Sequence, residues 1–206
     1  MKTIKHVIYL FILLSFMTNC NKKTDKVEVE FKLAIADNID SNEYQIYSLI
    51  LKEKFTTSNN LVIEQKTTGN LSISFGNIYF ETLKTENQNL DTTIFNDFIN
   101  KNNTVYNLDN KFIGSTKSIT LISSEEINYL FNSQDINKAW NEFYEKYPKS
   151  NGMIKFSRVG FNSDKSQGIV EIGHYYASLG SDGSLVYLVK ENNSWRIIKF
   201  INTWIS

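Results

Sequence analysis

The last third of the chain alternates between apolar and polar positions in four consecutive runs. These runs cover residues 154–161, 169–177, 185–190 and 195–204. Gly, Ser, Asn and Asp separate them, as in residues 180–183 and 192–193. Short connections between consecutive strands are typical of antiparallel hairpins. The pattern therefore predicts a four-stranded antiparallel meander.

A different period, of three to four residues, follows Asp40. It places Tyr44, Tyr47, Ile50 and Leu51 on one stripe of a helix. Asp40 and Glu43 have the spacing of a capping pair. We therefore expect a helix that begins there and ends near Phe55.

Three further helices are expected in the middle of the chain. Asp91 would cap the first, Ser123 and Glu126 form a capping box for the second, and the third carries Trp140, Phe143, Tyr144 and Tyr147 before Pro148 ends it. We expect Trp140 to be buried where this last helix covers the sheet. Residues 71–83 fit either a strand or a loop.

These elements indicate an α+β fold in which several amphipathic helices pack on one face of the C-terminal meander. Residues 61–64 and 118–122 are candidate extra strands at the edge of the sheet. Residues 27–31 form a possible first strand. We expect one domain over residues 31–206, with its sheet-bearing half at about residues 120–206.

The first twenty residues have the pattern of an exported precursor. Lys2 and Lys5 form a basic head, and residues 7–17 are apolar apart from Ser15. That run is too short to span a bilayer, which takes roughly 20 apolar residues. A basic head before a short apolar run is typical of a secretory signal peptide, here residues 1–19.

Cys20 follows this run directly and is the only cysteine. The segment resembles the cleavage box of bacterial lipoprotein precursors, in which the cysteine carries the lipid, although Asn19 stands where a small residue is usual. The alternative is a free cysteine beside an ordinary signal peptide. A lipid on Cys20 implies a membrane anchor, with residues 20–30 as a flexible tether.

Residues after Cys20 bear on the location. Asn21, Lys22 and Lys23 do not resemble an inner-membrane retention signal. We therefore expect an envelope lipoprotein, lipid-anchored at the outer membrane, and the side it faces stays open. The chain has 22 basic and 22 acidic residues, a balance that gives no electrostatic reason to expect nucleic acid as a partner.

Two strings near the C-terminus carry a resemblance. They are Phe156-Ser157-Arg158-Val159-Gly160-Phe161-Asn162 and the closing Trp204-Ile205-Ser206, preceded by the Trp140 to Pro148 segment. This part, about residues 120–206, resembles a domain of uncharacterised exported proteins of Bacteroidota. In look-alikes the region near 174–183 often carries cysteines, and here it has none. The resemblance implies a domain boundary and no activity.

His174 is one candidate catalytic residue. Strand alternation places it on a face with Val170, Ile172 and Tyr176, near a strand end where partial exposure is expected. A histidine near Glu171 and Asp182 could act as a general base. However, Glu171 alternates to the other face and Asp182 falls in an expected loop. The alternative is a hydrogen-bonded histidine at the end of a strand.

Arg158 is the second candidate. An arginine among aromatic residues could hold a carboxylate or phosphate through its fork of donors. The alternative, which we favour, is an ion pair with a neighbour such as Glu171 that supports the sheet.

The sequence gives no motif for a metal, a cofactor or a nucleophile. Once Cys20 is lipidated no thiol is left, and Asp182-Gly183-Ser184 lacks the further acids of a calcium loop. Neither a Gly-x-Ser-x-Gly elbow nor a glycine-rich phosphate loop occurs. We therefore expect no metal and no cofactor.

Two classes of function follow. The sequence favours a non-catalytic binding or accessory module over an enzyme. Its partner would be a small ligand, a glycan or a protein, and blocking a toxin in the envelope is one version. The alternative is an envelope hydrolase that uses His174 and Arg158.

Overall fold

The computed structural model describes residues 29–69, 73–114 and 117–206, and for residues 73–77 the backbone only. Phe31–Ser206 forms one compact unit. The expected signal peptide and Cys20 lie outside the described residues. Within those residues, no helix combines the length and apolarity needed to cross a membrane.

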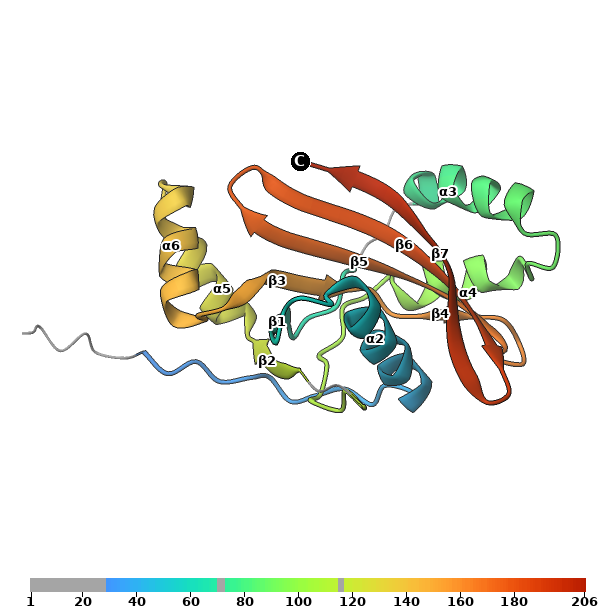
Figure 1. Cartoon of the computed structure of the whole chain (residues 1–206), viewed down its shortest axis with the longest axis horizontal. Coiled ribbons are helices and arrows are strands. Elements are labelled where there is room, and N and C mark those ends of the chain that lie inside the picture. Colours follow the sequence, from blue (N-terminus) through green and yellow to red (C-terminus); the bar gives the residue numbers. More distant parts are fainter. Residues whose placement is uncertain (1–28, 70–72, 115–116) are drawn as a thin grey trace, which may run out of the picture. The chain divides into compact units, whose positions relative to one another are not determined.

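The compact unit contains helices on a mixed sheet (Figure 1). The helices are α2 (Ser41–Lys54), α3 (Ile73–Glu86), α4 (Thr93–Lys101), α5 (Ser124–Phe131) and α6 (Ile136–Lys146). The strands are β1 (Asn60–Glu64), β2 (Ser118–Ile122), β3 (Ser150–Phe156), β4 (Gly160–Phe161), β5 (Gln167–Ala177), β6 (Gly180–Glu191) and β7 (Ser194–Ile205). The α+β class expected from the sequence is therefore confirmed.

The sheet has seven strands, in the order β2-β1-β3-β5-β6-β7, with β4 paired to β5. Its antiparallel part, β3-β5-β6-β7, corresponds to the expected meander. The detail differs, because β1 pairs with β2 and β3 in parallel and so extends the sheet beyond residues 120–206. The two candidate extra strands exist, and β1 is an interior strand.

The expected strand over residues 154–161 is interrupted. β3 ends at Phe156, and β4 begins at Gly160. Between them the backbone N–H of Val159 donates to Glu43 of α2 at 3.0 Å. Ser157 still donates its backbone N–H to Glu171 O of β5 at 2.9 Å, but the N–H groups of Arg158 and Val159 donate to Asn102 and Glu43, and the strand is interrupted there.

α2 covers one face of the sheet. Its stripe Tyr44, Tyr47, Ile50 and Leu51 is buried against Ile154, Phe156, Val170, Ile172, Val186 and Leu188. Asp40 caps the helix as expected, since its side chain accepts a hydrogen bond from Asn42 N at 2.9 Å. Glu43, read as the second member of the capping pair, turns instead into the core.

The other helices cover the opposite face, so the expectation of helices on one face only is wrong. α3 and α4 pack on Ile169, Leu185 and Tyr187, which alternate with the residues under α2. α5 and α6 pack on Val62 and Met153 and bury Trp140, as expected. Figure 1 shows α5 and α6 near β3, and α3 and α4 near β4 and β7.

Two local expectations also need correction. Residues 73–83, the described part of the stretch read as strand or loop, belong to α3, whose Phe80 and Leu83 are buried one helical turn apart. Residues 180–183, read as a turn, belong to β6. Residues 29–31, the described part of the possible first strand, form no strand.

Candidate functional site

Two glycines lie side by side on the face that carries the two helix pairs. Gly173 of β5 pairs with Gly183 of β6. The row continues to Lys155 on β3 and to Trp204 on β7. Along β5 this position lies between Ile169, which packs under α3 and α4, and Tyr175, which packs against the α5–α6 cluster.

Aromatic rings lie directly on these glycines. A Cβ on Gly183 would be 2.1 Å from Trp204 Nε1, and one on Gly173 would be 3.0 Å from the Tyr175 ring. The two ring centroids are 5.6 Å apart with a 40° tilt. The glycines therefore serve to let both rings rest on bare backbone.

Glu171 shares this face, two residues before Gly173 on β5. Its side chain is buried, with 6% of the residue exposed. The Trp204 indole N–H donates a hydrogen bond to the carboxylate. Its Oε2 atom has no hydrogen-bond partner among the residues that the structure describes. Burial raises the pKa of Glu171 from its ordinary value of 4.5 to about 7, and the Trp204 hydrogen bond only partly opposes this.

The charges around Glu171 do not neutralise it. Lys155, the cation next to Gly173 on this face, forms an ion pair with Glu64 at 2.9 Å. The pKa of Tyr175 is raised by burial and further by the charges of Glu171 and Glu64. A buried carboxyl group without a full set of partners is costly, and such groups cluster at functional sites.

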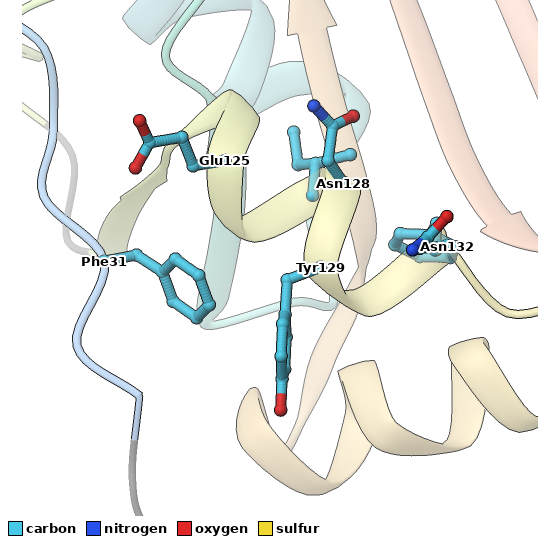
Figure 2. A pocket seen from close by; sticks show the side chains of 7 residues that line it. Phe31, Glu125, Asn128, Tyr129 and Asn132 are labelled. Atoms are coloured by element: carbon cyan, nitrogen blue, oxygen red, sulfur yellow. The ribbon is translucent and has the colours of Figure 1, made fainter.

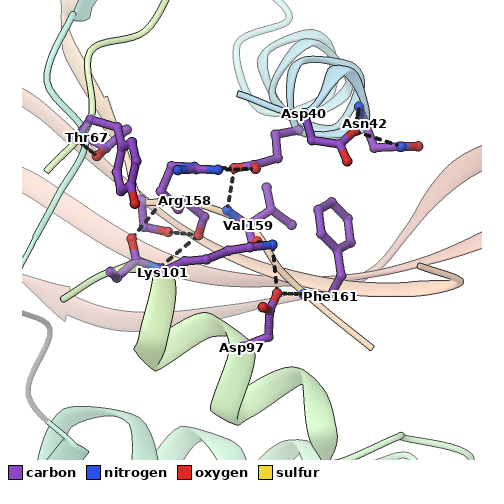
Figure 3. Close-up of polar contacts among 12 residues, drawn as sticks. Asp40, Asn42, Thr67, Asp97, Lys101, Arg158, Val159 and Phe161 are labelled. Carbon is purple, nitrogen blue, oxygen red and sulfur yellow. Dashed lines mark hydrogen bonds and ion pairs between the residues drawn. The ribbon is translucent and has the colours of Figure 1, made fainter. Parts of the chain in front are cut away.

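Arg158 lies on the other face and has a structural partner (Figure 3). Its Nε and Nη2 atoms donate to the two carboxylate oxygens of Glu43 at 2.8 and 2.7 Å. Glu43 has no exposed surface, and Arg158 is 7% exposed. The ion pair expected as the alternative reading is therefore present, but its partner is Glu43 and not Glu171.

Further contacts fix this pair in place. The Tyr106 ring lies 4.2 Å from the Arg158 guanidinium carbon. Asn102 accepts from the Arg158 backbone N–H at 2.8 Å. Burial alone would lower the pKa of Arg158, but the hydrogen bonds and charge of Glu43 outweigh it and raise that pKa. The Nε–Nη2 edge of the guanidinium, which would bind a carboxylate or phosphate in two-pronged fashion, is therefore occupied by Glu43.

An ion pair on α4 lies beside this network. Figure 3 shows Lys101 and Asp97 near Phe161. Lys101 Nζ is 2.8 Å from Asp97 Oδ2, which also accepts from the Phe161 backbone N–H at 2.7 Å. Together these bonds attach α4 to β4.

His174 is also held by the protein. It is 7% exposed, so the expectation of partial exposure is wrong. Its Nε2–H donates to the Asn151 carbonyl oxygen, and its Nδ1 is 3.4 Å from Asp182 Oδ2. Asp182 lies opposite His174 in β6, and not in a loop, and also binds Lys54 at 2.7 Å. A general base must reach a substrate proton, and both nitrogens of this ring already face protein atoms.

The structure does not bring His174 and Arg158 together. Arg158 binds Glu43 in the first turn of α2, whereas the His174 cluster contacts Lys54 and Phe55 at its end. These ends are roughly 16 Å apart along the helix axis, at about 1.5 Å per residue. In the described part of the chain, no group of three or more His, Cys, Asp or Glu side chains could hold a metal ion.

A hollow lies beside α5 (Figure 2). Its lining includes Phe31 and Tyr129, whose ring centroids are 5.2 Å apart. Lys146 lies over the Phe31 ring at 5.1 Å. The hollow has no buried polar group comparable to Glu171, so it gives no equal indication of a ligand.

From the sequence, Glu171 was expected only as a possible partner for His174 or Arg158. One signal was present, because Glu171 stands between Ile169, Val170 and Ile172 in an apolar strand. The contribution of Gly173, Gly183 and Trp204 depends on the register of three strands, which spacing in the sequence does not give. Comparison of the chain with protein-family models, with curated proteins and with solved structures found no match.

Proposed function

We propose that the chain is an envelope lipoprotein, anchored through Cys20 at the outer membrane, whose domain binds a ligand without converting it. The observation that carries the binding function is the buried Glu171 carboxylate, with one oxygen unpaired, beneath Tyr175 and Trp204. An unpaired buried carboxylate oxygen does not stabilise the fold. A ligand with a suitable donor would supply the missing hydrogen bond.

The contacts of the two catalytic candidates support binding over catalysis. Arg158 and His174 each bind protein partners, and these partners lie at opposite ends of α2. The hydrolase alternative needs both side chains in one cleft. We therefore place the ligand on the opposite face, at Glu171. The resemblance to exported proteins of Bacteroidota supports the envelope location and leaves small molecule, glycan or protein, including a toxin, as ligand classes.

The test uses the full-length lipoprotein in neutral detergent micelles. It is mixed with a small-molecule and glycan extract of the producing cells' envelope, and bound compounds are identified by mass spectrometry after gel filtration. We expect a compound that is retained by the protein, recovered unchanged, and lost with Glu171→Gln. Glu191→Gln, an exposed substitution, is the matched control.

Two results would contradict this function. A compound recovered in a cleaved form that requires His174 would support the hydrolase. Equal retention by the parent and by Glu171→Gln would show that the ligand does not bind at Glu171.

A further inference from the structure

We propose that the Glu171 site recognises a primary ammonium group carried on an aliphatic chain. This inference rests on the proposed binding function and names the ligand class for the same site. It is argued from the charge of the site, from its aromatic rings and from the bare backbone beneath them.

The charge of the site calls for a cation with N–H donors. Glu171 Oε2 can accept hydrogen bonds and receives none from the described residues. Trp204 supplies one neutral donor to this carboxylate. A primary ammonium carries three donors and a full positive charge, and charge-assisted hydrogen bonds are about twice as strong as neutral ones. Lys155 does not take this role, because Glu64 holds it at 2.9 Å.

The aromatic rings suit the same ligand. Tyr175 and Trp204 are each partly exposed and lie 5.6 Å apart, centroid to centroid. The faces of such rings attract cations, and they also contact aliphatic carbons favourably. An ammonium that binds Glu171 from this side would pass between or beside the two rings.

The glycines make the approach possible. Gly173 and Gly183 have no side chains that could hold the rings above them in place. Movement of the Trp204 ring would uncover the backbone of two adjacent strands, which lie about 5 Å apart. That width accommodates an aliphatic chain in contact with both strands.

The test follows the Trp204 indole N–H by NMR in the full-length protein in neutral detergent micelles. The chain has three tryptophans, and Trp204→Phe identifies the signal by removing it. The probes are n-butylamine, butyltrimethylammonium and 1-butanol at the same pH. We expect n-butylamine to shift the signal with a Kd on the order of 1 mM, as for a ligand with so few atoms. The quaternary ion, which has no N–H donor, and the neutral alcohol should bind at least about tenfold more weakly.

Two variants separate recognition from folding. Glu171→Gln keeps the size of the side chain and removes its buried charge, so it should fold at least as stably as the parent and raise the Kd of n-butylamine about tenfold or more. Glu191→Gln, a change to an exposed carboxylate of β6 paired with Arg196, should leave that Kd within about twofold. Ethanolamine and a capped Gly-Lys-Gly peptide then distinguish a free amine from a lysine side chain, and binding of either supports the ammonium site.

Other outcomes overturn the inference. Equal binding of the quaternary ion would indicate aromatic contact alone, and equal binding of butanol would indicate an apolar site. No shift at 20-fold above the expected Kd, about 20 mM, would exclude an ammonium ligand. If an envelope compound without an amine still binds through Glu171, the proposed function stands and only this inference fails.

Discussion

Arg158 binds both carboxylate oxygens of Glu43, through Nε at 2.8 Å and Nη2 at 2.7 Å. The pair joins the first turn of α2 to the segment between β3 and β4. Removing one partner leaves the other charge buried alone, which typically costs about 3–5 kcal/mol.

Glu43→Ala should therefore lower the free energy of unfolding by about 3–5 kcal/mol in urea melts. The control is Glu191→Ala, which breaks the exposed pair with Arg196 and should leave the urea midpoint almost unchanged. A Glu43→Ala midpoint equal to that of the parent would show that the pair does not hold the helix.

His174→Ala should destabilise the protein by about 1–3 kcal/mol, because it leaves the Asn151 carbonyl without its donor and empties a buried site. Leu179→Ala, at an exposed position of the same hairpin, is the control and should change little. If His174→Ala keeps full stability but loses the biological role, the hydrolase alternative gains support.

Trp140→Ala should cost about 3–5 kcal/mol, since the indole is buried among Phe131, Phe143 and Tyr144. Thermal melts of the variant beside the parent measure this loss. A melt that overlays the parent would contradict the packing of α6 on the sheet.

Cys20 should carry the lipid. Mass spectrometry of the N-terminus from membrane fractions should find an acylated Cys20 as the first residue. Cys20→Ala is the control and should release the chain from that fraction. A mature chain that begins at another residue and carries no acyl group would contradict the prediction.

Burial of Glu171 should also make stability depend on pH. Between about 4.5 and 7 the folded state holds a proton that the unfolded state has lost. The free energy of unfolding should therefore fall as pH rises through this range, by about 3 kcal/mol in total, and level off above it. Other titratable groups of this face include Tyr175, Glu64, Lys155, Tyr187 and Lys199, and they remain in Glu171→Gln. That variant should lose most of this pH dependence in urea melts at pH 4 to 8.

Sequence periodicity was sufficient for much of the fold. The stripe from Tyr44 to Leu51 predicted α2, and Asp40 marked its start, because a helix that packs on a sheet needs one apolar side. The hairpins were predicted from the alternation of apolar and polar residues in the strands and from the short turns between them. α3 was missed because its start, Ile73-Ser74-Phe75, alternates like a strand, and Phe80 and Leu83 are only one turn of a helical pattern.

The site could not be predicted in the same way. Glu171 meets Trp204 only because β5, β6 and β7 pair in one register, and residues far apart along the chain determine that register. Glu43 was read as a cap because its spacing from Asp40 fits one, whereas its side chain binds Arg158, distant in the sequence. Local patterns give the elements, and tertiary contacts decide which polar side chains are satisfied.

The most direct test of the account is the titration of Glu171 itself. NMR of a sample with 13C-labelled glutamate side chains, compared with Glu171→Gln, isolates this carboxyl carbon and follows its shift from pH 3 to 9. We predict a midpoint at a pKa of about 7, which moves lower when n-butylamine is bound. A midpoint at the ordinary value of 4.5, unchanged by the amine, would show that Glu171 is solvated and would contradict the proposed site.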